Sequence, residues 1–360
     1  MVYAPADSGA HSHDKTTQRK IAEQLASLLG RQFAGDYDAS HSGHIYLVPN
    51  DTLVGMAQAE AFGIRSEEDL FGGVVPQAFM ATKAITHPLM DASAQAPPGW
   101  SQAFARRVAG SVLAGYSAFT LQDAERAGLK LLERGPVRVK SVRAKAGLGQ
   151  TLVCSRGELE AALAAIVEPD LPHYGVVLEE HLNEVKTCSV GQIRVGEFAA
   201  SYCGTQRLTK NGRGEEVYGG SDLLVARGDF GALAGLGHSA ETRLTIEQAQ
   251  AYDTAAIDCF AGMFASRRNY DVAQGLNSAG AWCSGVLEQS WRIGGASSAE
   301  MLALLAFRDD SGLRAVKASS VEIYGACEAP PPHATVYFRG RDEHVGPMTK
   351  YAVVEPYADA

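Results

Sequence analysis

Hydrophobic residues recur at helical spacing near the start of the chain, and this spacing predicts an amphipathic helix over 16–33. The apolar run 44–48 that follows is short and ends at a proline, which predicts a strand, and a second helix is expected soon after it. This alternation is typical of α/β domains. The Pro- and Ala-rich stretch 92–100 has the composition of a loop or hinge. We therefore expect an N-terminal α/β domain over residues 1–84.

The middle of the chain alternates between helical patterns and short β-branched runs. Two helices are expected after Ser101, the second of them capped by Thr120. The runs PVRVKSV and QTLVC then predict a hairpin whose turn is the Gly-rich segment KAGLG. Ser155 and Glu158 form a capping-box pattern ahead of a further helix. Helix, hairpin and helix make a compact subdomain, which we place at 85–177.

Strand patterns dominate the last part of the chain, which predicts a second α+β unit over 178–360. Thr245 is expected to open a long helix that runs to about Arg268, and Ser297 with Glu300 is expected to cap another. No internal repeat of 20 to 50 residues is visible.

Composition and charge narrow the class of protein. The 360 residues are 46% hydrophobic and 20% charged, with 38 Gly and 14 Pro, which excludes disordered and collagen-like chains. The 32 basic against 41 acidic residues leave a net charge of −9, which makes nucleic acid an unexpected partner. Neither an apolar leader nor an apolar stretch of about 20 residues is present, so we expect a cytoplasmic protein without a membrane partner.

Cysteines and histidines offer little sign of a metal or disulfide framework. No CxxC pair occurs, and we expect reduced core thiols at all six cysteines, Cys154, Cys188, Cys203, Cys259, Cys283 and Cys327. The spacings His11 with His13 and His41 with His44 are two-ligand patterns without a second pair nearby. We therefore expect them to lie in a solvated tail and a solvated loop.

The common phosphate-binding motifs are absent, which leaves two lysines as candidates for phosphate contact. The sequence has no GxxxxGK[ST] motif, and the GLG of Gly147 and Gly149 lacks a third glycine and leads from strand to strand, which disfavours a dinucleotide-binding dehydrogenase. Lys140 ends the apolar run VRVK, where a buried ammonium must reach water or an anion. The Gly-rich loop after it favours phosphate contact over a surface position, whereas both interpretations stay open for Lys83.

Asp271 and Glu288 lie on late strands and form a candidate carboxylate pair. Two carboxylates in an apolar site would repel each other unless a divalent cation neutralised them, and Mg²⁺ prefers such oxygen ligands. Spacing alone favours the plainer alternative, in which Asp271 is a turn residue and Glu288 faces solvent.

The order of these features resembles the ATP-grasp superfamily over residues 80–307, closest to a bacterial branch. FMATKAITHPL and VRVKSVRAKAGLGQTLV place Lys83 and Lys140 where the family has its phosphate-contacting lysines, with Gly147 and Gly149 in the loop. VVLEEHL is similar to the hinge strand that holds adenine by its backbone. The resemblance assigns this role to Glu179, Glu180, His181 and Leu182, and the ribose hydroxyls to Glu184.

The segment GVLEQSWRIGGAS is similar to the Glu-x-Asn-x-Arg signature of the family's metal-binding strand. Glu288 and Arg292 match, whereas Ser290 stands where the family usually has Asn, and a hydroxyl is the weaker Mg²⁺ ligand. Asp271 takes the place of the first acidic ligand. The resemblance thus implies metal ligands Asp271, Glu288 and Ser290, with ATP and Mg²⁺, or Mn²⁺, as cofactors.

The resemblance also implies a fold and an activity. The expected fold is an α/β pre-ATP-grasp domain, a small central lid subdomain and a C-terminal antiparallel-sheet domain. The expected activity is an ATP-dependent ligase in which a substrate carboxylate becomes an acyl phosphate that an amine displaces, with Arg292 and Lys140 as catalytic residues. Small carboxylate and amine substrates, of amino-acid or peptide-like type, are the expected partners, and a homodimer is one option.

Two other functions remain open. A phosphotransferase on the same scaffold would phosphorylate a hydroxyl, and a non-catalytic nucleotide sensor would suit the loss of an amide at Ser290. The hairpin with Arg207, Lys210 and Arg227 would either line an anionic substrate or form an ordinary solvated hairpin.

Overall fold

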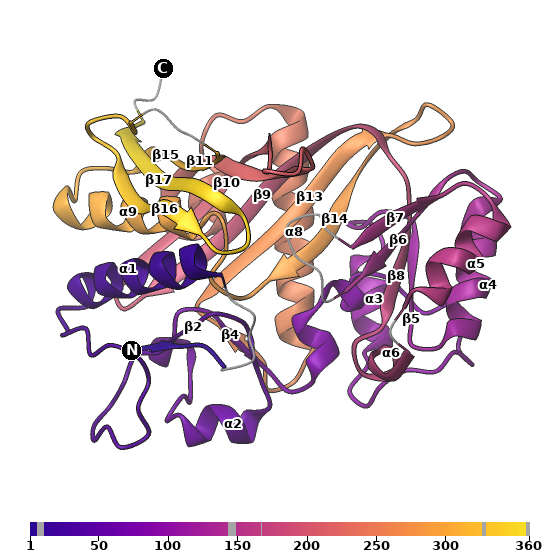
Figure 1. Ribbon diagram of the computed structural model, residues 1–360, viewed down its shortest axis with the longest axis horizontal. Coiled ribbons are helices and arrows are strands. Elements are labelled where there is room, and N and C mark those ends of the chain that lie inside the picture. Colours follow the sequence, from indigo (N-terminus) through magenta and orange to yellow (C-terminus); the bar gives the residue numbers. More distant parts are fainter. Residues whose placement is uncertain (6–10, 143–148, 167, 326–328, 358–360) are drawn as a thin grey trace.

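The computed structural model describes residues 1–5, 11–142, 149–166, 168–325 and 329–357. Figure 1 shows an N-terminal part at the lower left, a small sheet with its helices at the right, and a large sheet that runs from the centre to the C-terminal strands. The search for apolar helices of membrane-spanning length, made over these residues, finds none.

The N-terminal part is built from short elements around α1. Its strands form the parallel pairs β1–β2 and β3–β4, and β12 joins β4 antiparallel. The helix predicted over 16–33 is α1, which begins and ends earlier than expected, and the strand predicted over 44–48 is reduced to β2. The elements are β1 (Val2–Tyr3), α1 (Ser12–Leu28), β2 (Val48–Pro49), β3 (Leu53–Val54), α2 (Met56–Ala61), β4 (Gly73–Val75) and the 3₁₀ turns η1 (Glu67–Asp69), η2 (Ala78–Ala81) and η3 (Lys83–Ile85).

The small sheet has the antiparallel order β5-β8-β6-β7, and α4 and α5 pack on it through Leu131, Leu159 and Leu178. The predicted hairpin is β6–β7, and the hydroxyls of Thr120 and Ser155 cap α4 and α5 as expected. The elements are α3 (Gln102–Val108), β5 (Gly115–Ala118), α4 (Leu121–Leu132), β6 (Val137–Ser141), β7 (Gln150–Val153), α5 (Arg156–Ala164), η4 (Glu168–Asp170), α6 (Leu171–Tyr174) and β8 (Val176–Glu180).

The large sheet is antiparallel, with eight strands in the order β14-β13-β9-β10-β11-β15-β17-β16. Its two faces are covered differently. Cys203 and Tyr202 are neighbours on β10 and so point to opposite faces; Cys203 joins the core that includes α8, and Tyr202 joins the core that includes α1 and α9. The elements are β9 (Asn183–Val195), β10 (Phe198–Lys210), β11 (Glu216–Arg227), α7 (Phe230–Ala234), α8 (Ala240–Cys259), β12 (Phe264–Ala265), β13 (Arg267–Leu276), β14 (Trp282–Ser290), α9 (Ser297–Asp309), β15 (Ala315–Tyr324), β16 (Thr335–Asp342) and β17 (Gly346–Pro356).

Two helix predictions in this part are wrong at their ends. The helix expected from Thr245 to Arg268 is α8, which Ser239 caps by accepting the N–H of Thr242. It ends at Cys259, and Arg268 lies in β13 because that stretch is hydrogen-bonded to β9. The cap expected from Ser297 and Glu300 is not formed, because α9 has Ala296 as its N-cap without a side-chain capping bond, and Glu300 is fully buried.

The thiol and histidine expectations also need correction. Cys188 and Cys203 are buried, but Cys154 is exposed because it lies between β7 and the start of α5. Cys327 is outside the described residues. His11 and His13 are not in a free tail, since His11 is the N-cap of α1 and His13 is buried within that helix.

A buried ion pair joins α9 to β13. Arg267 donates from Nε and Nη2 to the two carboxylate oxygens of Glu300, at 3.0 and 2.7 Å. Both side chains are at most 1% exposed. Arg267 Nη1 donates at 2.5 Å to the carbonyl of Arg292, and Tyr202 donates at 2.6 Å to Glu300 Oε1. The pair therefore connects α9 with the two strands β10 and β13 and with the segment after β14.

We predict that Glu300→Leu lowers the free energy of unfolding by about 3–5 kcal/mol, because it leaves the Arg267 charge buried without its partner. The double variant Arg267→Met/Glu300→Leu should recover most of this loss, since neither charge then remains. Urea unfolding of wild type, both single variants and the double variant measures this. Equal destabilisation by the single and double variants would contradict the explanation.

Candidate functional site

Asp271 and Glu288 lie directly opposite each other on β13 and β14. A register shift follows at once, which leaves Leu287 as an extra residue. Tyr270 and Val272 belong to the core on the α8 side of the sheet, so Asp271 points to the other face. The carboxylate pair thus sits on the face that also carries α9, near the edge of the sheet.

Lys83 neutralises one member of this pair. Its Nζ lies 2.8 Å from Glu288 Oε2, and the lysine side chain is 7% exposed. Burial raises the pKa of Glu288, but the positive charges of Lys83, Lys140 and Arg292 outweigh it and lower the pKa. Glu288 is therefore held as a carboxylate, and three cations from separate elements act on it.

Gln289 positions the segment that carries Lys83. It points away from Glu288, because neighbours on a strand face opposite sides. Its amide donates to the carbonyls of Met80 and Thr82, at 2.9 and 2.7 Å. The chain just before Lys83 is thereby tied to β14, so the ammonium reaches Glu288.

The charge of Asp271 has neutral hydrogen-bond donors beside it instead of a lysine. Its Oδ1 accepts from Asn269 Nδ2 at 2.9 Å and from Ser189 Oγ at 3.4 Å, and both donors are neutral. Burial, and then the charge of Glu288, raises the pKa of Asp271. Among the described residues no lysine or arginine forms an ion pair with Asp271. A second carboxylate without a protein cation is a donor set that fits a divalent metal ion.

The next pair of residues on this face is Asn269 and Ser290. Ser290 Oγ lies 3.5 Å from Arg267 Nη1, so its hydroxyl is next to a guanidinium. Asn269 donates to Asp271, and its side-chain oxygen lies 2.9 Å from the hydroxyl of Tyr202, whose single proton is directed to Glu300. Asn269 was missed in the sequence, although its place two residues before Asp271 on one strand was a usable signal.

Lys140 and Glu179 form a second, fully buried cluster with His87. Lys140 Nζ contacts Glu179 Oε1, and His87 Nε2 lies 2.9 Å from Glu179 Oε2. All three side chains are at most 4% exposed. Burial raises the pKa of Glu179, but the contacts with Lys140 and His87 outweigh burial and lower the pKa to about 2. No sequence pattern pointed to His87, which follows Lys83 by four residues.

The other hinge residues make mostly backbone-directed contacts. Glu180 Oε1 accepts the N–H of Ala114 at 2.9 Å, and His181 Nδ1 accepts from Arg138 Nε at 3.1 Å. The N–H of His181 donates to Pro136 at 3.0 Å. These bonds tie the end of β8 to both neighbouring segments of the small sheet.

An apolar cluster and a strained residue follow the hinge. Leu182 is buried with Leu113 and Ala273, between the small sheet and β13. Glu184 is exposed with φ 51°, a left-handed conformation that no other described non-glycine residue adopts. In the predicted phosphate loop Gly149 has φ 67°, while Gly147 lies outside the described residues.

Arg292 lies just beyond β14, beside the N-terminal part. Its Nε is 3.5 Å from Asp51 Oδ1, and its Nη1 donates to the carbonyl of Ile293 at 2.9 Å. About a quarter of the side chain is exposed. The guanidinium is therefore partly held by the protein and still acts on Glu288.

The three cations of the hairpin, Arg207, Lys210 and Arg227, have different surroundings. Arg207 pairs with Asp222 at 3.2 Å, and Lys210 lies exposed at the end of β10. Arg227 donates to the carbonyls of Phe307 and Asp310, at 2.5 and 2.8 Å. Of the two alternatives left open for this hairpin, the contacts of Arg227 favour a structural role, because it binds the C-terminal end of α9.

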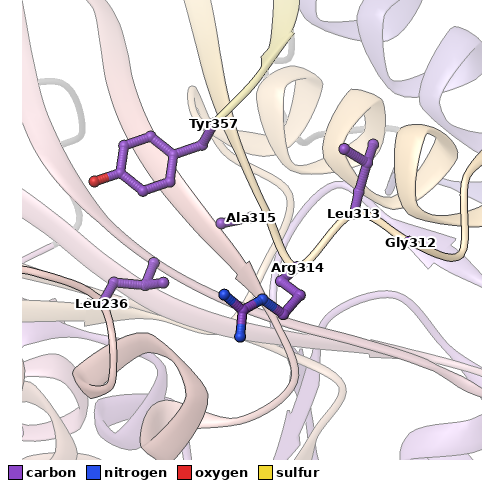
Figure 2. A pocket seen from close by; sticks show the side chains of 6 residues that line it. All are labelled: Leu236, Gly312, Leu313, Arg314, Ala315 and Tyr357. Carbon is purple, nitrogen blue, oxygen red and sulfur yellow. The ribbon is translucent and has the colours of Figure 1, made fainter. Parts of the chain in front are cut away.

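A separate pocket lies at the far end of α9 (Figure 2). It shares no residue with the carboxylate pair or the hinge. Its lining residues are Leu236, Gly312, Leu313, Arg314, Ala315 and Tyr357.

The chain was compared with known families, curated proteins and solved structures. The family model described as "Protein of unknown function (DUF3182)" matches residues 1–352. The curated proteins contain no match to the sequence.

Several solved structures are similar to the chain. Carboxyaminoimidazole ribonucleotide synthase from Aspergillus clavatus, complexed with ATP, has a TM-score of 0.51 and 14% identity over 94% of this chain and 91% of its own. A biotin carboxylase β-γ-ATP complex from Campylobacter jejuni has a TM-score of 0.53 and 9% identity over 94% of this chain and 85% of its own.

N5-carboxyaminoimidazole synthetase from Staphylococcus aureus, complexed with ADP, has a TM-score of 0.41 and 13% identity over 69% of this chain, which spans 65% of the length of that protein. At these identities the two matches above 0.5 show the fold alone. They confirm the ATP-grasp fold expected from the sequence.

We predict that Glu179→Gln destabilises the protein by about 3–5 kcal/mol near neutral pH, because Lys140 is left buried without its counter-charge. Glu179 has a pKa of about 2 in the folded protein, below its ordinary value of 4.5. Its contribution is therefore complete above about pH 4.5 and is lost as the pH falls towards 2.

Urea unfolding of wild type and variant across this range measures the effect, with the exposed Glu160→Gln as control. A difference between wild type and Glu179→Gln that stays constant from pH 5 to pH 2.5 would contradict it.

Proposed function

The chain belongs to the family described as "Protein of unknown function (DUF3182)", and we propose that it is an ATP- and Mg²⁺-dependent ligase. It would activate a substrate carboxylate as an acyl phosphate and join it to an amine. One observation carries the proposal: Asp271 and Glu288 face each other, Lys83 pairs with Glu288, and within the described residues no lysine or arginine forms an ion pair with Asp271.

The nucleotide would lie between the small sheet and β13. We assign adenine to the backbone of the hinge residues Glu179 to Leu182, beside the apolar cluster of Leu182, and the ribose hydroxyls to Glu184. The loop with Gly147 and Gly149 would cover the phosphates, which Lys83 and Lys140 would contact. The similar structures from Aspergillus clavatus and Campylobacter jejuni are complexes with ATP and β-γ-ATP, which supports a nucleotide here.

Lys140 already has a carboxylate partner in Glu179, and this bears on its role. Its contact with Glu179 orders the side chain before a nucleotide binds, so a shift of the ammonium towards a phosphate would not require ordering a free side chain. His87 stays on the same carboxylate and would keep Glu179 paired if Lys140 moved towards a phosphate.

Asp271 and Glu288 would hold Mg²⁺, or Mn²⁺ in its place, between the protein and the phosphates. The bound cation would neutralise charge that develops on the transferred phosphoryl group. We expect the amide oxygen of Asn269 to serve better than the Ser290 hydroxyl, because Arg267 lies against Ser290 and repels a cation there.

The chain's own residues then account for much of the phosphoryl transfer. A substrate carboxylate oxygen would attack the γ-phosphorus as the bond to ADP breaks, and the amine nitrogen would attack the acyl carbon as phosphate leaves. Arg292 would hold the transferring group through its guanidinium. Positioning and neutralisation by Lys83, Lys140 and Arg292 are the protein contributions that this chemistry needs.

We predict that Mg·ATP raises the melting temperature of wild type, and that Asp271→Asn and Glu288→Gln each remove most of the Mg²⁺-dependent part of this shift. A ligand that binds only the native state raises stability by RT ln(1 + [L]/Kd). The exposed variant Asp258→Asn is the matched control and should keep the full shift.

Product analysis with pooled carboxylates and amines then separates the functions. ADP with free phosphate and an amide product supports a ligase, ADP with a phosphorylated alcohol identifies a phosphotransferase, and ATP binding without turnover identifies a sensor. The absence of any shift at millimolar ATP would overturn the nucleotide site itself.

We further predict that Asn269→Ser raises the Mg²⁺ concentration needed for half of the ATP-dependent thermal shift at least tenfold, whereas Ser290→Ala changes it less than twofold. Electron paramagnetic resonance of bound Mn²⁺ gives an independent measure of the same site. If Ser290→Ala is the damaging change and Asn269→Ser is silent, the hydroxyl of Ser290 is the ligand.

A further inference from the structure

His11, Asp342 and His344 converge where α1 begins and the β16–β17 hairpin turns. Ser12 and Asp342, which touch here, are 330 residues apart in the sequence. The Nδ1 atoms of His11 and His344 lie 3.7 and 4.0 Å from Asp342 Oδ1, and the three donor atoms are all within 4.8 Å of one another. Figure 1 shows α1 beside β16, on the side of the molecule away from the small sheet.

The carboxylate of Asp342 is fixed in place. Its side chain is fully buried, and Oδ2 accepts from Ser12 Oγ at 2.7 Å and from the N–H of His13 at 3.1 Å. Oδ1 accepts the N–H of His344 at 2.9 Å and that of Val345 at 3.2 Å. In the described part of the chain its only ion-pairing partners are the two histidines. This buried anion therefore has no arginine or lysine to balance it there.

The imidazoles are placed as ligands rather than as hydrogen-bond partners. His11 occupies the N-cap position of α1 but makes no capping hydrogen bond. Its Nδ1 is buried and has no hydrogen-bond partner within the described residues. The rings of His11 and His344 meet edge to face, with centroids 4.7 Å apart. His344 is 65% exposed, which leaves a route to solvent.

The spacing of the donor atoms fits a shared ion better than direct contacts. Separations of 3.7 and 4.0 Å are too long for hydrogen bonds. A tetrahedral ion with bonds of about 2.0–2.1 Å places its ligand atoms roughly 3.3 Å apart. To reach this spacing, the two separations from Asp342 would shorten by about 0.4 and 0.7 Å, and the donor nitrogens of the two histidines, which lie within 4.8 Å of each other, would approach by at most about 1.5 Å.

We propose that His11 Nδ1, His344 Nδ1 and Asp342 Oδ1 bind a divalent transition metal of the Zn²⁺ class, with a water molecule as the fourth ligand. Imidazole nitrogen favours such ions over Mg²⁺, so this site and the all-oxygen site at Asp271 select different metals. Ser12 is a positioning residue, since it holds the second oxygen of the ligating carboxylate. The ion would lock the start of α1 to the C-terminal hairpin.

The test uses untagged full-length protein, stripped with a chelator and kept in excess Mg²⁺. We expect one Zn²⁺ per chain in competition with a chromophoric chelator, a rise in melting temperature, and visible absorption bands of a four-coordinate site when Co²⁺ replaces Zn²⁺. His11→Ala and His344→Ala should each weaken Zn²⁺ binding at least tenfold and remove the thermal shift. Ser12→Ala should weaken binding less than either.

His41→Ala is the matched control, because it removes a histidine from the other closely spaced pair and should bind Zn²⁺ as wild type does. Melting temperatures in chelator separate a folding defect from a lost ligand. Unchanged Zn²⁺ affinity in both His11→Ala and His344→Ala would overturn the proposal and show adventitious binding elsewhere. Absence of stoichiometric binding to wild type would overturn it as well, whatever the outcome of the ATP experiments.

Discussion

The buried pair of Arg267 and Glu300 is the interaction on which the site depends. A guanidinium and a carboxylate that are both withheld from water must satisfy each other, and their hydrogen bonds leave little freedom in orientation. The remaining donor of Arg267 binds the carbonyls of Ser290 and Arg292, so the end of β14 is held in one place. Through Tyr202 the same carboxylate reaches Asn269, and through Asn269 it reaches Asp271.

Charge balance distinguishes the two carboxylate clusters beside this network. In the small sheet Glu179 is fully paired, and burial with Lys140 and His87 makes the cluster rigid. On the large sheet Lys83 balances only Glu288, and Asp271 keeps neutral partners. Protein groups balance the charge of the first arrangement, whereas a bound divalent cation, as proposed, would balance Asp271 in the second. We regard this asymmetry as the physical basis for the proposed division between a hinge and a metal site.

Residues that sequence reasoning missed act mainly by holding others. Gln289 lies inside the recognised signature, yet its role depends on carbonyls of a segment about 200 residues away. His87, Tyr202 and Glu300 likewise gain their roles from distant partners. The role of Arg227 was left open for the same reason, since its partners are carbonyls at the end of α9. No local pattern can reveal a contact of this kind.

The sequence by itself determined the order of elements, the antiparallel hairpins and the caps at Thr120 and Ser155, because periodicity and turn chemistry are local. The ATP-grasp fold was expected from the resemblance of its motifs to that family. The sequence also singled out Lys83, Lys140, Asp271 and Glu288. Only the tertiary structure decided which of these charges meet. Strand register placed Asp271 against Glu288, and burial paired Lys140 with Glu179. Packing of α1 on the last hairpin brought His11 to Asp342. Electrostatic and coordination contacts depend on distances between elements, and those distances are set by the packed core.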